Sequence, residues 1–330
     1  MEIMKMGIEI IGIGSYLPEK ILTNIDLEKL VETSDEWITT RTGIKERRIA
    51  SESEATSDLA IKAAERAISN AKISPEEIDA IIVATITPDM AFPSTACFVQ
   101  KGLKAVNSAA FDISAACSGF IYGLTIGKDL IKSGTFNTVL VIGGETLSKI
   151  TDWHDRNTCV LLGDAAGAVI LRKTNSSSDI LSSYLGANGN YSDLLLMPGG
   201  GSRNPTTHKT VDEQLHYLKM EGNKLFKIAV KAMADSAQKA IALAGITCND
   251  VNLIIPHQAN IRIVEAVAKL LNVSMDKVFL NIHKYGNTSA ATTPVALEEA
   301  IREGKVKKGD IVTLVAFGGG LTWGAVVIRL

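Results

Sequence analysis

The chain has 330 residues, of which 46% are hydrophobic and 21% are charged. This composition is typical of a folded globular protein and excludes an intrinsically disordered one. The formal net charge of −2 excludes binding to nucleic acids or to membrane surfaces through bulk charge.

The first apolar stretch, Gly7 to Leu17, is interrupted by Glu9 and is too short to span a bilayer. Neither a basic segment nor a small-residue cleavage site accompanies it, so we expect a cytoplasmic protein. The cysteines are widely spaced and contain no Cys-x-x-Cys pair, which predicts neither a zinc site nor a disulfide framework. A reducing compartment would keep such thiols free. The four are Cys97, Cys117, Cys159 and Cys248.

The chain contains a diverged copy of itself. Each copy alternates strand and helix patterns and closes with two apolar strands, which predicts a mostly parallel sheet covered by helices. We expect an α/β protein of two similar halves, residues 1–174 and 175–330, with an insertion at about 146–162 in the first. The blocks that correspond are 73–82, 134–144 and 163–172 in the first copy and 246–255, 309–319 and 320–329 in the second.

Cys117 lies where a predicted strand, Ala109 to Ala116, meets a predicted helix that ends near Gly134. At a helix N-terminus, unpaired N–H groups and the helix dipole stabilise a thiolate, so we expect a lowered thiol pKa. Small neighbours would leave the sulfur approachable. Taken alone, a single cysteine in an apolar setting is more often a buried core residue.

Further polar groups follow predicted strands at their carboxyl ends, where open α/β sheets collect binding sites. The other copy has Ala84 in place of His257, so the repeat supplies the scaffold twice and the polar groups once. Each group alone has a structural explanation: a satisfied histidine, a turn residue or a tight strand exit. The groups are His257 after Leu253–Pro256, Asn287 after Val278–His283, and Gly318-Gly319-Gly320 after Ile311–Phe317.

Four motifs, which occur in one order along the chain, resemble those of the β-ketoacyl-acyl carrier protein synthase III family. This resemblance covers essentially the whole chain and implies an α/β thiolase fold, with two duplicated halves in five αβαβα layers. It implies decarboxylative condensation of an acyl-CoA primer with malonyl-acyl carrier protein through an acyl-cysteine, carried out by a homodimer. The motifs are Asp112–Phe120, Pro256–Arg262, Gly286–Ala291 and Phe317–Gly324.

The resemblance also implies a role for each group of the site. Cys117 would be the nucleophile. His257 Nε2 and the Asn287 amide would donate to the enolate oxygen, and the backbone N–H groups of Cys117 and Gly319 to the oxyanion at the acyl-cysteine. No metal or redox cofactor is implied, since Gly12-x-Gly14 lacks the third glycine of a dinucleotide site and no metal-ligand cluster appears.

The substrate-binding residues are likewise implied by the resemblance. Trp37 and Arg41 would sandwich the adenine of coenzyme A through stacking and cation–π attraction. Leu147 would shape the acyl pocket together with Phe92 from a partner subunit. The other expected coenzyme A contacts are Thr33, Arg156, Gly222, Phe226 and Asn260. The expected docking cations for the carrier protein are Lys227, Arg262 and Lys269, for which the alternative is a solvated helix face.

Other protein classes share this chemistry. A papain-like hydrolase also needs Cys, His and Asn, but its local cysteine signature is absent. Hydroxymethylglutaryl-CoA synthase and the chalcone synthase type are nearer relatives, and a condensing enzyme of secondary metabolism and a non-catalytic thiolase-fold scaffold stay as alternatives. The primer stays open as well, because one methylene in a hydrophobic pocket changes the binding free energy by only about 1–3 kcal/mol.

Overall fold

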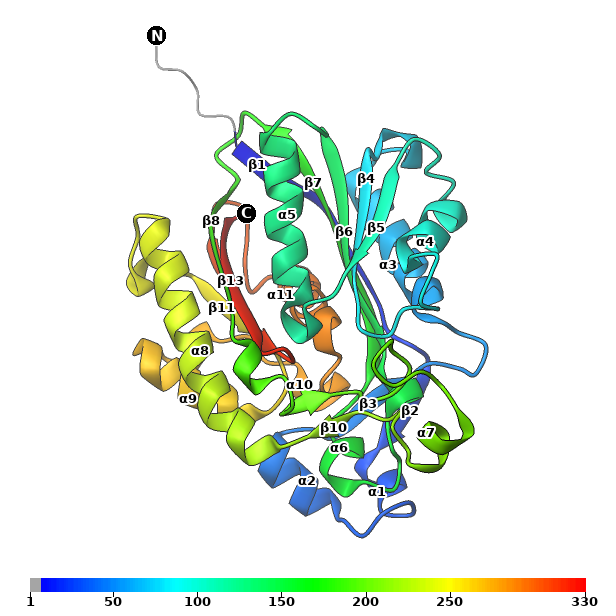
Figure 1. The fold of residues 1–330 in the computed structure, drawn as a ribbon. Coiled ribbons are helices and arrows are strands. Elements are labelled where there is room, and N and C mark those ends of the chain that lie inside the picture. The colour runs from blue at the N-terminus through cyan, green and yellow to red at the C-terminus, as the bar shows by residue number, and fades with distance from the viewer. Residues whose placement is uncertain (1–6) are drawn as a thin grey trace.

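The computed structural model describes residues 7–330, which form five layers in the order helix, sheet, helix, sheet, helix (Figure 1). The first sheet has five strands in the order β1-β7-β6-β4-β5. In it β4 runs parallel to β5 and β6, whereas β7 runs antiparallel to β1 and β6. The strands are β1 Gly7–Tyr16, β4 Ala80–Ala84, β5 Ala109–Ile113, β6 Thr138–Thr146 and β7 Asp164–Thr174.

The second sheet repeats this pairing with four strands in the order β11-β12-β13-β8. Its strands are β8 Asp179–Ala187, β11 Leu253–Pro256, β12 Ile311–Gly318 and β13 Thr322–Arg329. The counterpart of β5 is reduced to one bridge between Ile254 and Val278. The segment 278–283 is therefore not a strand, because the side chain of Gln258 bonds Phe279 O and Asn281 N in place of a further strand partner.

Helices cover both sheets and fill the space between them. In Figure 1, α5 and α11 lie between the sheets, α3 and α4 cover the first sheet, and α8 and α9 cover the second. None of the helices in residues 7–330 is long and apolar enough to cross a membrane. These helices are α3 Thr56–Ala71, α4 Thr95–Leu103, α5 Gly119–Lys132, α8 Gly222–Leu243, α9 Ile261–Leu271 and α11 Thr292–Arg302.

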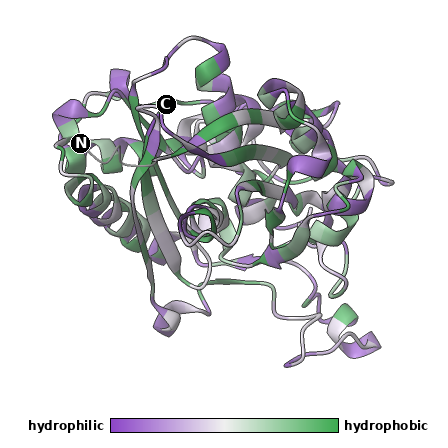
Figure 2. Ribbon diagram, turned by 90° about the horizontal axis from the view of Figure 1, so that it is seen from above, coloured by the Kyte–Doolittle hydropathy of each residue, from purple (hydrophilic) through white to green (hydrophobic). Residues whose placement is uncertain are grey.

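Burial on both faces explains the apolar strands. Every residue of β4 and β6 is buried, as expected for sheets covered by helices on each side. The strands of both sheets carry long hydrophobic stretches, while hydrophilic residues gather on outer helices and loops (Figure 2). Gly12 and Gly14 of β1 have a packing role, because a Cβ at either position would lie 2.4 Å from a backbone oxygen of α3.

Shorter elements gather at the lower end of Figure 1, beyond the carboxyl ends of the parallel strands. The strand β2 pairs with β3, and β9 pairs with β10. Two single-turn 3-10 helices, η2 Ala116–Ser118 and η7 Ser289–Ala291, lead directly into the buried helices α5 and α11. The remaining α-helices and strands are β2 Lys20–Thr23, α1 Asn24–Leu27, α2 Asp35–Thr42, β3 Glu46–Ile49, α6 Arg156–Cys159, β9 Leu195–Leu196, α7 His208–Asp212, β10 Lys219–Met220 and α10 Ile282–Tyr285.

Candidate active site

Two equivalent turns, one from each half, meet at the centre of the molecule. The turn η2 carries Cys117 into α5, and the turn η7 carries Ala290 into α11. Each begins with a residue in the left-handed region, Ala116 with φ 46° and Ser289 with φ 48°. A side chain in this region is strained, and such residues cluster at functional sites. The N-termini of the buried helices α5 and α11, one from each half, therefore lie next to each other.

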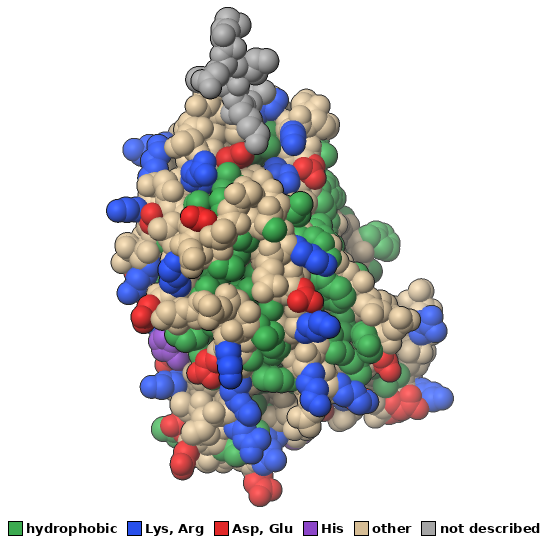
Figure 3. Space-filling model, turned by 90° about the vertical axis from the view of Figure 1, so that its left-hand side faces the viewer, with side chains coloured by type: hydrophobic (Ala, Val, Ile, Leu, Met, Phe, Trp, Pro, Cys, Tyr) green, Lys and Arg blue, Asp and Glu red, His purple; other side chains and the backbone are tan. Residues whose placement is uncertain are grey.

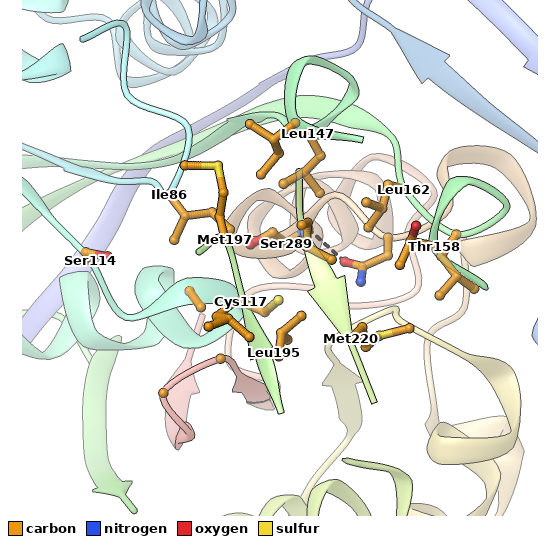
Figure 4. Close-up of a pocket in the computed structure, with 18 of the residues that line it drawn as sticks. Ile86, Ser114, Cys117, Leu147, Thr158, Leu162, Leu195, Met197, Met220 and Ser289 are labelled. Carbon is orange, nitrogen blue, oxygen red and sulfur yellow. Dashed lines mark hydrogen bonds between the residues drawn. The ribbon is translucent and has the colours of Figure 1, made fainter. Parts of the chain in front are cut away.

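A cavity of about 330 Å³ opens at these turns. Cys117, Asn287, Ser289 and Gly319 line it, and the rest of its wall is mostly aliphatic. Figure 4 shows the sulfur of Cys117 beside Leu195, with Ser289 nearby and Leu147 on the far wall. The labelled apolar residues of the wall are Ile86, Leu147, Leu162, Leu195, Met197 and Met220. Such a pocket suits an apolar ligand that reaches the thiol.

The thiol of Cys117 is protonated in this state. Burial raises the pKa of Cys117 to about 12, and the Glu145 carboxylate raises it further. The expectation of a lowered pKa at the helix N-terminus is wrong. The free-energy cost of removing the thiolate from water exceeds the stabilisation that the helix N-terminus provides. The sulfur needs a proton acceptor before it can attack.

The side chain of Asn287 has a fixed orientation. Its Oδ1 accepts a hydrogen bond from the backbone N–H of Ser289 at 2.9 Å, so the amide nitrogen is left for the cavity. The backbone of Asn287 is held on both sides, by Leu161 O at 2.8 Å and by the N–H of Gly163 at 3.0 Å. Gly286 precedes it with φ 64°, and a Cβ there would lie 2.7 Å from Leu161 O.

His257 directly follows β11 and is buried. It is 4% exposed, and its Nδ1 lies 2.6 Å from Thr292 Oγ1. The Thr292 hydroxyl donates in turn to Ser289 O at 2.7 Å, which links the ring to the turn beside Cys117. Burial lowers the pKa of His257 to about 4, so the ring is neutral near pH 7. His257 is therefore connected to the site, although it is not part of the cavity lining.

The glycine turn after β12 lies against the backbone of Cys117. A Cβ at Gly318 would lie 2.5 Å from Cys117 N, so only glycine fits there. Thr322 Oγ1 lies 2.8 Å from Ala115 O and accepts from Ser118 Oγ at 2.8 Å. These bonds join the two loops that carry the backbone N–H groups of Cys117 and Gly319. Thr322 belongs to the sequence motif Phe317–Gly324, but its contacts become apparent only in the folded structure.

Glu145, at the end of β6, is a buried carboxyl that the sequence analysis missed. It is completely buried, and this burial raises its pKa to about 7. It accepts from the hydroxyls of Thr87 at 2.6 Å and Thr85 at 3.1 Å and from the N–H of Ile86 at 3.1 Å. No cation is among these donors. The carboxyl fixes the segment 85–87, whose Ile86 lines the cavity. An acidic residue directly after an apolar strand was the available signal.

Three of the expected coenzyme A residues meet at the surface. The guanidinium carbon of Arg41 lies 5.5 Å from the Trp37 ring centroid, and that of Arg156 lies 5.0 Å from it. The other expected contacts are not joined to this stack by a hydrogen bond. Thr33 is half-buried just before α2, Gly222 and Phe226 occupy the first turns of α8, and Asn260 caps α9 by accepting from Arg262 N at 2.9 Å.

The remaining expected residues divide by exposure. Leu147 is 1% exposed and lines the cavity, whereas Phe92 is 83% exposed and does not line the cavity of its own chain. Lys227, Arg262 and Lys269 are exposed on α8 and α9, and none has an ion-pair partner among residues 7–330. Figure 3 views the molecule from this side and shows Lys and Arg side chains over its lower part. The described residues contain no cluster able to hold a metal ion.

Comparisons with known proteins agree on one family. A family profile described as "3-Oxoacyl-[acyl-carrier-protein (ACP)] synthase III" matches residues 111–189, and its C-terminal counterpart matches 241–330. A protein of Caldanaerobacter subterraneus subsp. tengcongensis named β-ketoacyl-[acyl-carrier-protein] synthase III is 58% identical over 98% of both chains.

Two solved structures share the fold. The crystal structure of 3-oxoacyl-[acyl-carrier-protein] synthase III from Aquifex aeolicus superposes with a TM-score of 0.92, at 54% identity over 98% of this chain and 100% of that one. The priming β-ketosynthase from the R1128 polyketide biosynthetic pathway superposes with a TM-score of 0.90, at 31% identity over 98% and 96%. The predicted thiolase fold is confirmed.

Proposed function

This chain belongs to the β-ketoacyl-acyl carrier protein synthase III family, and we propose that it joins an acyl-CoA primer to malonyl-acyl carrier protein by decarboxylative Claisen condensation. The product is a 3-oxoacyl-acyl carrier protein, the first intermediate of type II fatty acid synthesis. The observation that carries the residue-level proposal is the cavity in which a thiol, a free amide N–H₂ and a glycine turn converge.

Cys117 accepts the acyl group in the first step. Its sulfur attacks the thioester carbonyl of acyl-CoA, and the acyl-cysteine thioester that results stays activated for the second step. The aliphatic wall around the sulfur accommodates the acyl chain and excludes water, which would hydrolyse the intermediate. Leu147 belongs to this wall, which agrees with its expected role in the acyl pocket.

The second step forms an enolate as malonyl-acyl carrier protein loses carbon dioxide. Its oxygen needs hydrogen-bond donors, and the Asn287 amide, which faces the cavity, and the His257 ring are the candidates. Each preorganised donor in a site of this kind contributes about 3–4 kcal/mol. The enolate carbon then attacks the acyl-cysteine, and the backbone N–H groups of Cys117 and Gly319 receive the oxyanion that forms there.

These steps need no metal ion and no redox cofactor, because a thiol, an imidazole, an amide and backbone donors supply all of the chemistry. Coenzyme A thioesters and a free catalytic thiol fit a reducing compartment, so we place the protein in the cytoplasm. We assign the adenine of coenzyme A to Trp37, Arg41 and Arg156, because stacking and cation–π contacts would hold it there. Thr33, Gly222, Phe226 and Asn260 complete the proposed coenzyme A site.

We propose a homodimer as the working form. Phe92 is a large apolar side chain with 83% exposure, and β5 is one of the two edge strands of the first sheet. Both features suit contact with a second copy, in which Phe92 would reach the acyl pocket of the partner. A sedimentation mass near 35.2 kDa at micromolar concentration would contradict this assembly.

A rate survey over acyl-CoA primers with malonyl-acyl carrier protein tests the proposed function. We expect release of free coenzyme A and of carbon dioxide in equal amounts, with formation of the 3-oxoacyl product. A priming role in polyketide synthesis is the second candidate, favoured by the similarity to the R1128 enzyme. It would be supported by a preference for primers that a fatty acid enzyme uses poorly. No condensation with any primer would reject both.

A further inference from the structure

The contact between His257 and Thr292 fixes where the imidazole carries its proton. Thr292 Oγ1 lies 2.7 Å from Ser289 O, and two oxygens at that distance need a proton between them. A carbonyl has no proton to give, so the hydroxyl donates its only one there. At 2.6 Å from His257 Nδ1, the same oxygen can then act only as an acceptor.

The neutral ring consequently has its proton on Nδ1 and a lone pair on Nε2. A lone pair repels the negatively charged enolate oxygen. We propose that Thr292 is a positioning residue that holds neutral His257 in this tautomer, so that Nε2 can donate to the enolate only after it has taken up a proton. The catalytic role of this proton rests on the proposed function, whereas the tautomer follows from the hydrogen-bond geometry alone.

Among residues 7–330, no charged group forms an ion pair with His257 or shifts its pKa. Burial alone shifts the pKa of the ring, downward, so solvent rarely protonates it near pH 7. The titratable groups beside Ser289 are the Cys117 thiol on η2 and the Glu145 carboxyl on β6. Further along α11, Glu298 and Glu299 pair with Arg302, and Glu299 also pairs with Lys284 of α10. Ser289 and Cys117 are close neighbours in Figure 4.

The reaction itself releases the proton that Nε2 needs. Acyl transfer forms the bond from Cys117 Sγ to the acyl carbon and breaks the bond from that carbon to the sulfur of coenzyme A. The thiol proton passes to His257 Nε2, and coenzyme A leaves as a thiolate that takes a proton from water. The imidazolium then donates to the enolate oxygen that forms as carbon dioxide leaves.

Condensation closes the cycle. The enolate carbon bonds to the acyl carbon, the bond to Sγ breaks, and the Cys117 thiolate recovers its proton from His257. One proton is taken from water per turnover, and it is found on coenzyme A. His257 therefore carries the thiol proton from the first half-reaction to the end of the second, and Thr292 makes this possible by keeping Nε2 unprotonated at the start.

Neutron diffraction from deuterium-exchanged crystals near neutral pD locates the proton directly, without any measurement of activity. We expect density for a deuteron on His257 Nδ1 and none on Nε2. A deuteron on Nε2 of the neutral ring would overturn the proposal. Failure to condense any primer would instead reject the proposed function and leave the assigned tautomer standing.

A kinetic test uses malonyl-acyl carrier protein decarboxylation without primer, in a Cys117→Ala background, where Nε2 must take its proton from solvent. We expect the rate to fall about tenfold per pH unit above the apparent pKa of His257. Thr292→Val removes the hydroxyl at nearly constant shape and frees the ring to carry its proton on Nε2, so the pH profile should flatten. Thr292→Ser restores the hydroxyl and should restore the slope.

Equal slopes for the valine and serine variants would contradict a positioning role, and so would a flat profile for the Cys117→Ala background itself. Thermal unfolding of each variant shows whether it is folded. Should Thr292→Val fail to fold, the neutron density and the slope of the background still decide the question.

Discussion

The side-chain oxygen of Asn287 accepts a hydrogen bond from the backbone N–H of Ser289 at 2.9 Å, and this single contact decides what Asn287 can do. An amide has one acceptor end and one donor end, so occupation of the oxygen leaves the nitrogen for the cavity. The Ser289 N–H is itself aimed by a left-handed turn with φ 48°. The strained turn thus orients a hydrogen-bond donor at the place where the proposed enolate forms.

Asn287→Asp tests this orientation. A carboxylate keeps the acceptor for the Ser289 N–H but replaces the donor with a negative oxygen, so the fold should persist. We expect decarboxylation of malonyl-acyl carrier protein to fall by at least about 10²–10³, while acylation by acyl-CoA is retained. Release of labelled carbon dioxide and the mass of the intact protein measure the two steps. Decarboxylation within about threefold of the original rate would show that Asn287 donates nothing.

Much of the site could be predicted from the sequence, because its residues occur in local motifs at strand ends. Cys117, Asn287 and Gly319 were named from such motifs and line one cavity. The hydrogen-bond chain from His257 through Thr292 to Ser289 could not be predicted, since it depends on how β11 and α11 pack together. The duplication indicated the two-sheet arrangement, yet it gave no warning that 278–283 would lose its strand partners.

Electrostatics was the weakest part of the sequence-based account. The position of Cys117 before a helix suggested a lowered thiol pKa, and burial reverses that sign. Glu145 was missed because burial of a carboxyl without a cation is a property of the three-dimensional packing, and its place at the end of an apolar strand was the only signal in the sequence. Gly12 and Gly14, whose spacing lacks the third glycine of a dinucleotide site, allow close packing of α3.

Glu145→Gln should make Cys117 more reactive. Removal of a buried negative charge lowers the pKa of the thiol, since the carboxylate is one of the groups that raise it. We expect iodoacetamide to alkylate Cys117 faster than in the original protein at the same pH. Asp164→Asn is the matched control, because Asp164 is also a buried carboxyl with a raised pKa but does not act on Cys117. Equal acceleration in both variants would contradict a direct effect of Glu145.

Glu145 also predicts a pH dependence of stability. Its folded pKa of about 7 lies above the ordinary value of 4.5, so the folded state binds the proton more tightly than the unfolded state. The resulting stabilisation is fully present below pH 4.5 and is lost as the pH rises through 7. The free energy of unfolding should therefore fall less over this interval in Glu145→Gln than in the original protein. Urea titrations at several pH values measure the difference, and identical pH profiles would count against it.

Trp37→Ala should weaken binding of coenzyme A without touching the second substrate. Stacking of a base on an aromatic ring contributes about 1–3 kcal/mol, so KM for acyl-CoA should rise about 5- to 150-fold. KM for malonyl-acyl carrier protein should stay within about twofold. Steady-state kinetics with each substrate varied in turn gives both values. Trp323→Phe, on β13, is a control for loss of an indole elsewhere in the chain. An unchanged KM for acyl-CoA in Trp37→Ala would show that the adenine does not stack on Trp37.

Charge reversal on α8 and α9 tests the proposed docking surface. The carrier protein is acidic by family resemblance, and Lys227, Arg262 and Lys269 are exposed without an ion-pair partner in the described part of the chain. Lys227→Glu with Arg262→Glu should raise KM for malonyl-acyl carrier protein at least fivefold at low salt, and less at high salt. The control is Lys305→Glu with Lys308→Glu, which precede β12. An equal rise in KM for the two double variants would show that Lys227, Arg262 and Lys269 form a solvated helix face and not a docking surface.

Mass spectrometry of the intact protein after incubation with acyl-CoA, combined with release of labelled carbon dioxide, tests the central claim that Cys117 holds the acyl group between two separable half-reactions. The original protein should gain one acyl mass, mapped to the peptide that contains Cys117, and should lose it when malonyl-acyl carrier protein is added. Cys117→Ala should gain none and still release some carbon dioxide. An acyl adduct that persists in a folded Cys117→Ala protein would contradict the account.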